Sequence, residues 1–177
     1  MNNLKILSPA FTDHGPMPVR YSCKGENINP PLHVRDLPAD AKCLAIIVED
    51  PDAPSGVFDH WVVWNIPPME EIPERLEAGV SGNNSKNKTG YTGPCPPSGT
   101  HRYAFKVYAL DTVLDLPEGT NKKNLLDKMR DHILAAGEFV GIFSKNALET
   151  ASGEGIISLE FFKREFAFYI PVQVFSF

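Results

Sequence analysis

Proline is the residue type that most restricts what this chain can fold into. The 177 residues include 16 prolines and 13 glycines, and the prolines are clustered. Because proline fixes φ and has no amide hydrogen, it is excluded from helix interiors and from central strand positions. The sequence therefore predicts many short strands joined by rigid, shaped loops.

The composition predicts a globular protein and does not favour nucleic-acid binding. Hydrophobic residues make up 42% of the chain and charged residues 22%, which argues against wholesale disorder. The length suits one domain with a sizeable core. The formal net charge is −5 and no run of Lys or Arg occurs. Since nucleic-acid binding normally requires a basic face, we expect no such partner, and an anion would have to be held in a local pocket.

The cysteines and the hydropathy favour a cytoplasmic protein. Cys23, Cys43 and Cys95 form no CxxC pair, and an odd number cannot all pair within one chain. A reduced compartment is the simpler interpretation. The N-terminus has no apolar run long enough for a signal peptide. No stretch approaches the roughly 20 apolar residues that span a bilayer, so we expect no transmembrane segment.

Hydrophobic periodicity predicts a β-rich chain. In residues 102–110 the alternation places one set of side chains on a single face of a strand: Tyr103, Phe105, Val107 and Ala109. Other segments have the length and apolar content of strands: 4–9 as an edge strand, 19–22, 43–49, 58–66 and 139–143. Between them we expect a turn at 13–16, a polar loop at 24–34 and a long loop at 79–100, of a length that is usually functional or mobile.

One helix is predicted, over residues 121–136. Thr120 is a suitable N-cap, and Gly137 lies where the helix would end. The apolar residues of this segment recur at helical spacing: Leu125, Met129 and Ile133.

Residues 146–177 read differently from the rest and define a second region after a domain of residues 1–145. This extension is rich in Phe, and residues 156–174 alternate well enough for two strands. Its high β-propensity and low charge would make it an aggregation hazard if it were exposed. We expect it to be packed, to pair with another chain as in a homodimer, or to lie outside the natural domain.

Two proline-rich clusters carry the residues most suited to ligand chemistry. The first is DPDAP at 50–54, with His60 shortly after it, and the second is GYTGPCPPSGTHRY at 90–103. Each stiff loop lies next to an apolar strand and presents a histidine, and such loops lose little entropy on binding. Together His60, His101 and an inward Asp50 would form a donor-rich pocket with one acceptor. That suits a phosphate or phosphomonoester, whose protonated oxygen could donate to Asp50.

Structural roles compete with this interpretation. A histidine at a strand start is more often a hydrogen-bonded structural residue than a ligand-binding one. Either Asp50 or Asp52 is expected to be structural, for example by capping backbone amides. We expect Arg102 to form an ion pair on the strand face opposite Tyr103. Nothing near Cys95 would lower its pKa and make it a reactive thiol.

Catalytic interpretations are weaker. His60, His101 and Asp50 could form a facial triad for a metal, but the accompanying carboxylates and closely spaced ligand pairs are not evident. Ser98 lies in a Pro/Gly loop without an evident base, and no GxSxG elbow is present. No P-loop or dinucleotide-binding glycine pattern occurs either. We therefore expect no catalytic residue, no metal and no cofactor.

At these two clusters the chain resembles the phosphatidylethanolamine-binding protein family, also called the Raf kinase inhibitor protein family. The likeness is closest to the bacterial and archaeal, YbhB/YbcL-like branch. It rests on DPDAP at 50–54 followed by HWVV and Asn65, and on GPCPP at 93–97 followed by GTHRY. CKGENINPP at 23–31 and GEFVG at 137–141 resemble further motifs of the branch. The match covers about residues 3–145.

The resemblance implies a mainly β fold, a large antiparallel sheet packed on a smaller one in a sandwich with one or two short helices. It also implies a small surface pocket for phosphate, acetate or phosphorylated head groups. By position, its ligand-binding residues would be Asp50, Ala53, His60, Cys95, Pro96, His101 and Tyr103. Cys95 stands where the family often has Gly or Ala, which would narrow the pocket.

The family also suggests partners. Its members are reported as lipid head-group binders, kinase-pathway modulators and serine protease inhibitors. The expected partner is thus a small anionic or phosphorylated ligand, with a protease or a kinase as the alternative. For an inhibitor, an exposed loop within residues 79–92 would be the contact.

Overall fold

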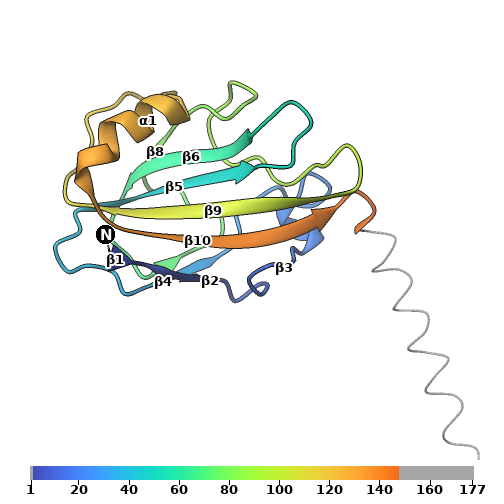
Figure 1. Cartoon of the computed structure of the whole chain (residues 1–177), viewed down its shortest axis with the longest axis horizontal. Coiled ribbons are helices and arrows are strands. Elements are labelled where there is room, and N and C mark those ends of the chain that lie inside the picture. Colours follow the sequence, from blue (N-terminus) through green and yellow to red (C-terminus); the bar gives the residue numbers. More distant parts are fainter. Residues whose placement is uncertain (1, 148–177) are drawn as a thin grey trace, which may run out of the picture. The chain divides into compact units, whose positions relative to one another are not determined.

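The expected mainly β sandwich is confirmed in the computed structural model, which describes residues 2–147 (Figure 1). The larger sheet has the order β1-β10-β9-β5-β6-β8, with β3 also paired to β10, and the smaller sheet has the order β2-β4-β7. The strands of the larger sheet are β1 (Asn2–Asn3), β3 (Gly15–Pro16), β5 (Cys43–Asp50), β6 (Phe58–Ile66), β8 (Val80–Ser81), β9 (Thr100–Leu110) and β10 (Ile133–Ser144). Those of the smaller sheet are β2 (Lys5–Leu7), β4 (Leu32–Arg35) and β7 (Glu71–Ile72).

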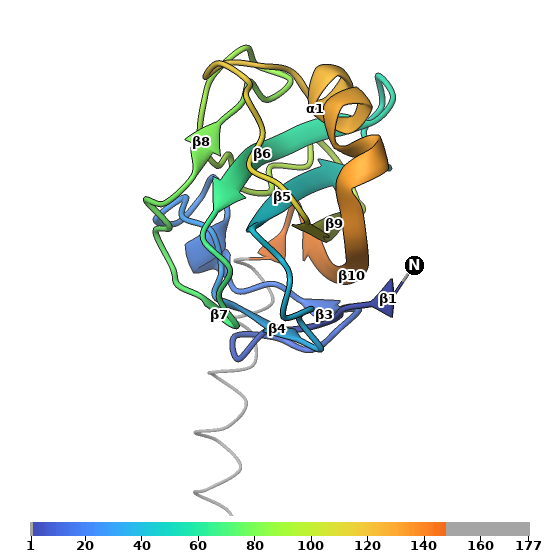
Figure 2. The same ribbon diagram turned by 90° about the vertical axis from the view of Figure 1, so that its left-hand side faces the viewer.

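Strand β5 is buried on both faces along residues 43–48, as the apolar sequence there predicts. On one face Cys43, Ala45 and Ile47 pack in a cluster with Leu125 and Met129 of the helix α1 (Lys122–Met129). The alternate residues of β5 are buried as well and point to the opposite face by the period of two. Both views show α1 and the smaller sheet on opposite sides of the larger sheet (Figures 1 and 2).

The three strongest strand predictions are confirmed. Segments 43–49 and 58–66 form β5 and β6, and 102–110 lies within β9. The four alternating residues of β9 are fully buried, as predicted: Tyr103, Phe105, Val107 and Ala109. The edge strand expected in 4–9 is present as β2, at the edge of the smaller sheet. Alternation succeeded here because one face of each strand contacts the core.

Other element predictions were wrong. Residues 19–22 are not a strand, because Val19–Tyr21 form a 3-10 helix, η1, in which the Ser22 hydroxyl donates to the Val19 carbonyl at 2.7 Å. The polar loop expected at 24–34 ends earlier, since β4 begins at Leu32. The loop expected at 79–100 contains β8.

The predicted helix is shorter than expected and begins differently. Its N-cap is Asn121 rather than Thr120, because the Asn121 side chain accepts the amide of Asn124. The helix ends at Met129, a short 3-10 segment, η2 (Arg130–His132), follows, and β10 begins at Ile133. Gly137 is therefore not a helix stop. It lies within β10, where a Cβ would come within 2.3 Å of the Leu4 carbonyl oxygen.

By its internal contacts the chain divides into the units Met1–Lys145 and Asn146–Phe177. All ten strands described here belong to the first unit. The two strands expected in 156–174, and their role in dimerisation, lie outside the described residues. Within residues 2–147, no helix combines the length and the apolar character needed to cross a bilayer.

Candidate functional site

A cavity of about 520 Å³ lies where β5 ends and where β6 and β9 begin. Strand β5 pairs with β9 only as far as Glu49 opposite Ala104, so the first residues of β9 continue past the end of β5. Six of the seven residues predicted for the pocket line this cavity: Asp50, Ala53, His60, Cys95, His101 and Tyr103. The volume is within the range of about 300–1,000 Å³ that is usual for small-molecule sites.

The seventh predicted residue, Pro96, is buried and is not on the cavity wall, whereas Pro97 is. The wall also includes residues that the sequence did not single out, among them Val57, Phe58, Ser85, Lys86 and Thr92. Ser85, Lys86 and Thr92 come from the long segment between β8 and β9. Its length pointed to function, but no local pattern identifies which of its residues face the cavity.

Asp50 and His101 form a buried pair at the base of the cavity. Asp50 Oδ2 lies 2.7 Å from His101 Nδ1, and both residues are less than a tenth exposed. Asp50 Oδ1 accepts the backbone amide of Asp52 at 2.8 Å. Since a carboxylate only accepts, Nδ1 of His101 is the donor and its Nε2 is left for a ligand. Asp50 thus orients His101, rather than serving mainly as the ligand acceptor that was expected.

His60 is held in the same manner by a carbonyl group. Its Nδ1 donates to the Thr92 carbonyl oxygen at 2.6 Å, and its own carbonyl accepts the Thr92 amide at 2.9 Å. Burial lowers the pKa of His60, although the Thr92 carbonyl and the Asp50 carboxylate act in the opposite direction. The ring is therefore mainly neutral at pH 7, with a lone pair on Nε2.

Tyr103 contributes a hydroxyl group that lacks a proper partner. The residue is fully buried, and its ring lies edge-on to His60 at a centroid distance of 5.1 Å. The hydroxyl is near the backbone amide of Cys95 but forms no hydrogen bond of ordinary geometry with any described residue. Burial raises the pKa of this phenol. Because an unpaired buried hydroxyl is costly, this group is suited to a ligand oxygen.

Asp52 and Arg102 lie outside the cavity and have the structural roles that were expected. The Arg102 side chain donates through Nε and Nη2 to the two oxygens of Asp52, at 2.9 and 2.7 Å. The backbone amide of Arg102 also donates to Asp52 Oδ2. The Arg102 side chain and amide together lower the pKa of Asp52 to about 2. This pair ties the loop after β5 to the start of β9.

Two of the three cysteines are paired, contrary to the reduced compartment that their odd number favoured. Cys23 and Cys95 form a disulfide with their Cα atoms 5.5 Å apart, and both residues are exposed. Cys43 is the free cysteine of the described region; it is buried, and burial raises the pKa of its thiol. Cys95 is therefore not a reactive thiol. The cysteine argument for a reduced compartment also fails, since disulfides are characteristic of oxidising compartments and of some hyperthermophile interiors.

The segment that carries Cys23 is packed tightly against the cavity rim. A Cβ on Gly93 would lie 2.3 Å from the Tyr21 carbonyl oxygen, so only glycine fits there. The Gly93 amide donates to Asn27 Oδ1 at 2.8 Å, and the Cys23 amide donates to the Pro94 carbonyl at 3.1 Å. The disulfide is thus one of several links between these two segments.

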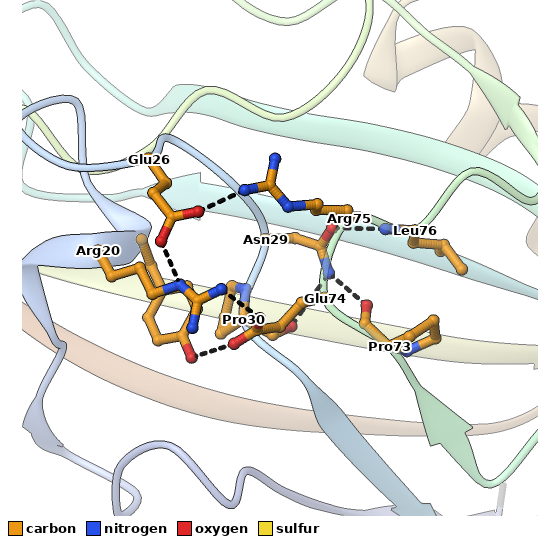
Figure 3. A network of polar contacts seen from close by, with 9 residues as sticks. Arg20, Glu26, Asn29, Pro30, Pro73, Glu74, Arg75 and Leu76 are labelled. Carbon is orange, nitrogen blue, oxygen red and sulfur yellow. Dashed lines mark hydrogen bonds and ion pairs between the residues drawn. The ribbon is translucent and has the colours of Figure 1, made fainter.

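A polar network also connects the segment that carries Cys23 to residues 73–76 (Figure 3). Arg20 forms an ion pair with Glu74 at 2.9 Å. The buried Asn29 donates to the Pro73 carbonyl and accepts the Leu76 amide, at 2.9 and 3.0 Å. Residues 20–29 are therefore fixed to residues 73–76, and the rim that they support is fixed with them.

The metal alternative concerned His60, His101 and Asp50. Across residues 2–147, no group of three or more His, Cys, Asp or Glu side chains is arranged to hold a metal ion.

Fold, cavity and comparisons define the class of this protein. The family model for phosphatidylethanolamine-binding protein matches residues 7–144, and the chain belongs to this family. The resemblance predicted from the two proline-rich motifs is thereby confirmed. Family membership supports a ligand-binding protein.

Individual relatives place the chain in the bacterial and archaeal branch. It is 50% identical over 150 residues to the UPF0098 protein of Methanothermobacter thermautotrophicus, covering 80% of this chain and 99% of that protein. A solved putative homologue of the family from Chlamydia trachomatis is 42% identical, with a TM-score of 0.78, covering 82% of this chain and 99% of the other. The structure of YbcL from Escherichia coli, described as a new member of the mammalian family, is 25% identical with a TM-score of 0.73, covering 80% and 98%.

Proposed function

We propose that the chain is a non-catalytic, regulatory binding protein whose cavity takes a small anion or a phosphorylated head group. The observation that carries this proposal is the convergence of three polar groups of buried residues that have no hydrogen-bond partner within residues 2–147. These are Nε2 of His60, Nε2 of His101 and the hydroxyl of Tyr103, all on residues that line one cavity. Both imidazoles use Nδ1 for the protein, which leaves the other nitrogen for a ligand.

This set matches the hydrogen-bonding capacity of phosphate. The Tyr103 hydroxyl can donate to a phosphate oxygen. Each free imidazole nitrogen can accept a P–OH proton or, when protonated, donate to an unprotonated oxygen. A negative ligand stabilises the protonated ring, so binding of the dianion is expected to take up a proton at His60. Affinity should therefore increase as the pH falls toward the reference histidine pKa of about 6.5.

The absence of catalysis and a regulatory role are parts of the same proposal. Asp50 and His101 resemble two members of a hydrolytic triad, but no serine or cysteine thiol that lines the cavity is placed as a nucleophile by a described contact. Ser85 Oγ accepts the Asp59 amide at 2.8 Å, Cys95 is in the disulfide, and Ser55 is exposed. An esterase and phosphatase screen that found turnover, abolished by His101→Gln, would contradict this part.

Titration of inorganic phosphate and phosphoethanolamine, followed by histidine side-chain NMR signals, tests the binding. Both ligands should shift His60 and His101 at millimolar concentration, and His101→Gln should abolish binding. His132 provides a matched control, because its Nδ1 is paired with Asp111 at 2.8 Å in the same manner but on an exposed surface. His132→Gln should bind as the wild type does. A folded wild-type protein without shifts at His60 and His101 would refute the proposal.

Inhibition of a protease or a kinase is the second proposal, and it uses the exposed turn at residues 85–89. This turn is preorganised, because Asn84 accepts the amides of Lys86 and Lys88 at 2.9 and 3.3 Å. A rigid, exposed turn loses little entropy on docking. Inhibition of a chymotrypsin-like enzyme that is lost when the turn is shortened, yet retained in His101→Gln, would favour this role over the cavity.

A further inference from the structure

Lys86 places a positive charge on the cavity wall that the family motifs did not indicate. Among the residues lining the cavity, the side chains that ionise are Asp50, His60, Lys86, His101 and Tyr103. Asp50 is already bonded to His101, and burial favours the neutral forms of His60 and Tyr103. Lys86 is thus the permanent cation of the wall.

The ammonium group of Lys86 is free to meet a ligand. Two other lysines are neutralised, since Lys106 of β9 pairs with Glu49, and Lys122 of α1 pairs with Glu49 and Asp59. Lys86 is exposed and forms no ion pair with another residue of the described region. Its charge disfavours protonation of His60, which is consistent with its position beside the cavity.

The backbone of Lys86 is coupled to His60 by a chain of hydrogen bonds. Asn84 is 3% exposed, and its Oδ1 accepts the Lys86 amide while its Nδ2 donates to Thr92 Oγ1 at 3.0 Å. The Thr92 carbonyl oxygen in turn accepts Nδ1 of His60. The turn that carries Lys86 therefore keeps a fixed position relative to His60.

We propose that Lys86 is a specificity residue, which makes the cavity prefer doubly charged terminal phosphomonoesters over singly charged carboxylates and phosphodiesters. The inference rests on the proposed anion-binding function and names its ligand class. Coulomb attraction is proportional to the ligand charge, so one cation discriminates between a dianion and a monoanion of similar size. At an exposed position the effect is modest and is reduced by salt.

The test measures affinities of methyl phosphate, dimethyl phosphate and acetate by calorimetry or NMR at low salt, near about pH 7.5, where a phosphomonoester is mostly a dianion. Lys86→Met should weaken methyl phosphate about fivefold and each monoanion only about twofold, as expected for an exposed ion pair. Lys86→Arg should retain the preference. Lys88→Met is the matched control, because Lys88 lies in the same turn and its amide also bonds to Asn84, yet it is not on the cavity wall.

The outcomes separate this inference from the function on which it rests. If the wild type binds the probes and His101→Gln abolishes binding, but Lys86→Met changes all three affinities by one factor or none, only the role of Lys86 is overturned. An effect of Lys88→Met equal to that of Lys86→Met would overturn it as well, because the discrimination would then come from net charge. If the folded wild type binds no probe, the proposed function and the inference fail together.

Discussion

The disulfide between Cys23 and Cys95 allows a quantitative prediction about stability. The two cysteines are 72 residues apart in the sequence. In the chain-entropy model, a link that closes a loop of this length removes about 15 cal/mol/K from the unfolded state, or about 4 kcal/mol at 25 °C. The double variant Cys23→Ser/Cys95→Ser should therefore unfold with a free energy lower by up to about 4 kcal/mol. Both positions are exposed, so the serines themselves should cost little.

Urea denaturation of the wild type and the double variant, each with and without a reductant, measures this difference. The wild type should lose stability on reduction, whereas the double variant should not respond. The dependence on urea should become steeper without the link, because the open chain exposes more surface on unfolding. The denatured, unreduced wild type should contain one reactive thiol, that of Cys43. Equal urea midpoints for the wild type and the double variant without reductant, or three thiols in the wild type, would refute the reasoning.

Three further predictions concern the site and the core. Burial lowers the pKa of His60, so below about pH 6.5 the unfolded chain binds a proton that the folded chain does not. The free energy of unfolding should therefore fall as the pH falls. Urea midpoints measured at several pH values should show this dependence, and His60→Asn should reduce it. Asn84→Ala removes the hydrogen bonds to Lys86 and Thr92, which should weaken phosphate binding and lower the free energy of unfolding by about 1–3 kcal/mol. Unchanged phosphate binding would show that the turn does not position the cavity wall. Leu125 of α1 is fully buried in the core cluster, so Leu125→Ala should cost about 2–5 kcal/mol by thermal or urea unfolding, with phosphate affinity unchanged.

Where the sequence predicted strands correctly, a simple burial pattern was present. Residues 43–48 are continuously apolar because β5 is covered on both faces, and the alternation at 102–110 follows one face of β9. The prediction failed at 121–136 because apolar spacing there continues past the helix. Ile133 packs against the same core cluster as Leu125, although it belongs to β10. Periodicity records which side chains are buried but does not distinguish the two elements that bury them.

Local sequence patterns identified some of the residues that line the cavity but not others. Asp50, His60 and His101 were recognisable because each lies in or next to a stiff, proline-rich segment. Lys86 and Thr92 lie in a polar stretch without a periodic pattern, and their position depends on hydrogen bonds of the buried Asn84. The pairing of Cys23 with Cys95 was not predictable either, because the count of three cysteines permits several arrangements and none is favoured by spacing alone.

By itself, the sequence determined the mainly β character of this protein, its central strands and the two histidine loops. These features depend on local rules, namely the fixed φ of proline and the alternation of buried side chains. Only the tertiary structure decided which loops meet at the cavity and that Asp50 orients His101. It also decided that a disulfide-bonded cysteine and a lysine lie on the cavity wall. Such features depend on strand order and on contacts between segments up to 72 residues apart, which no local pattern specifies.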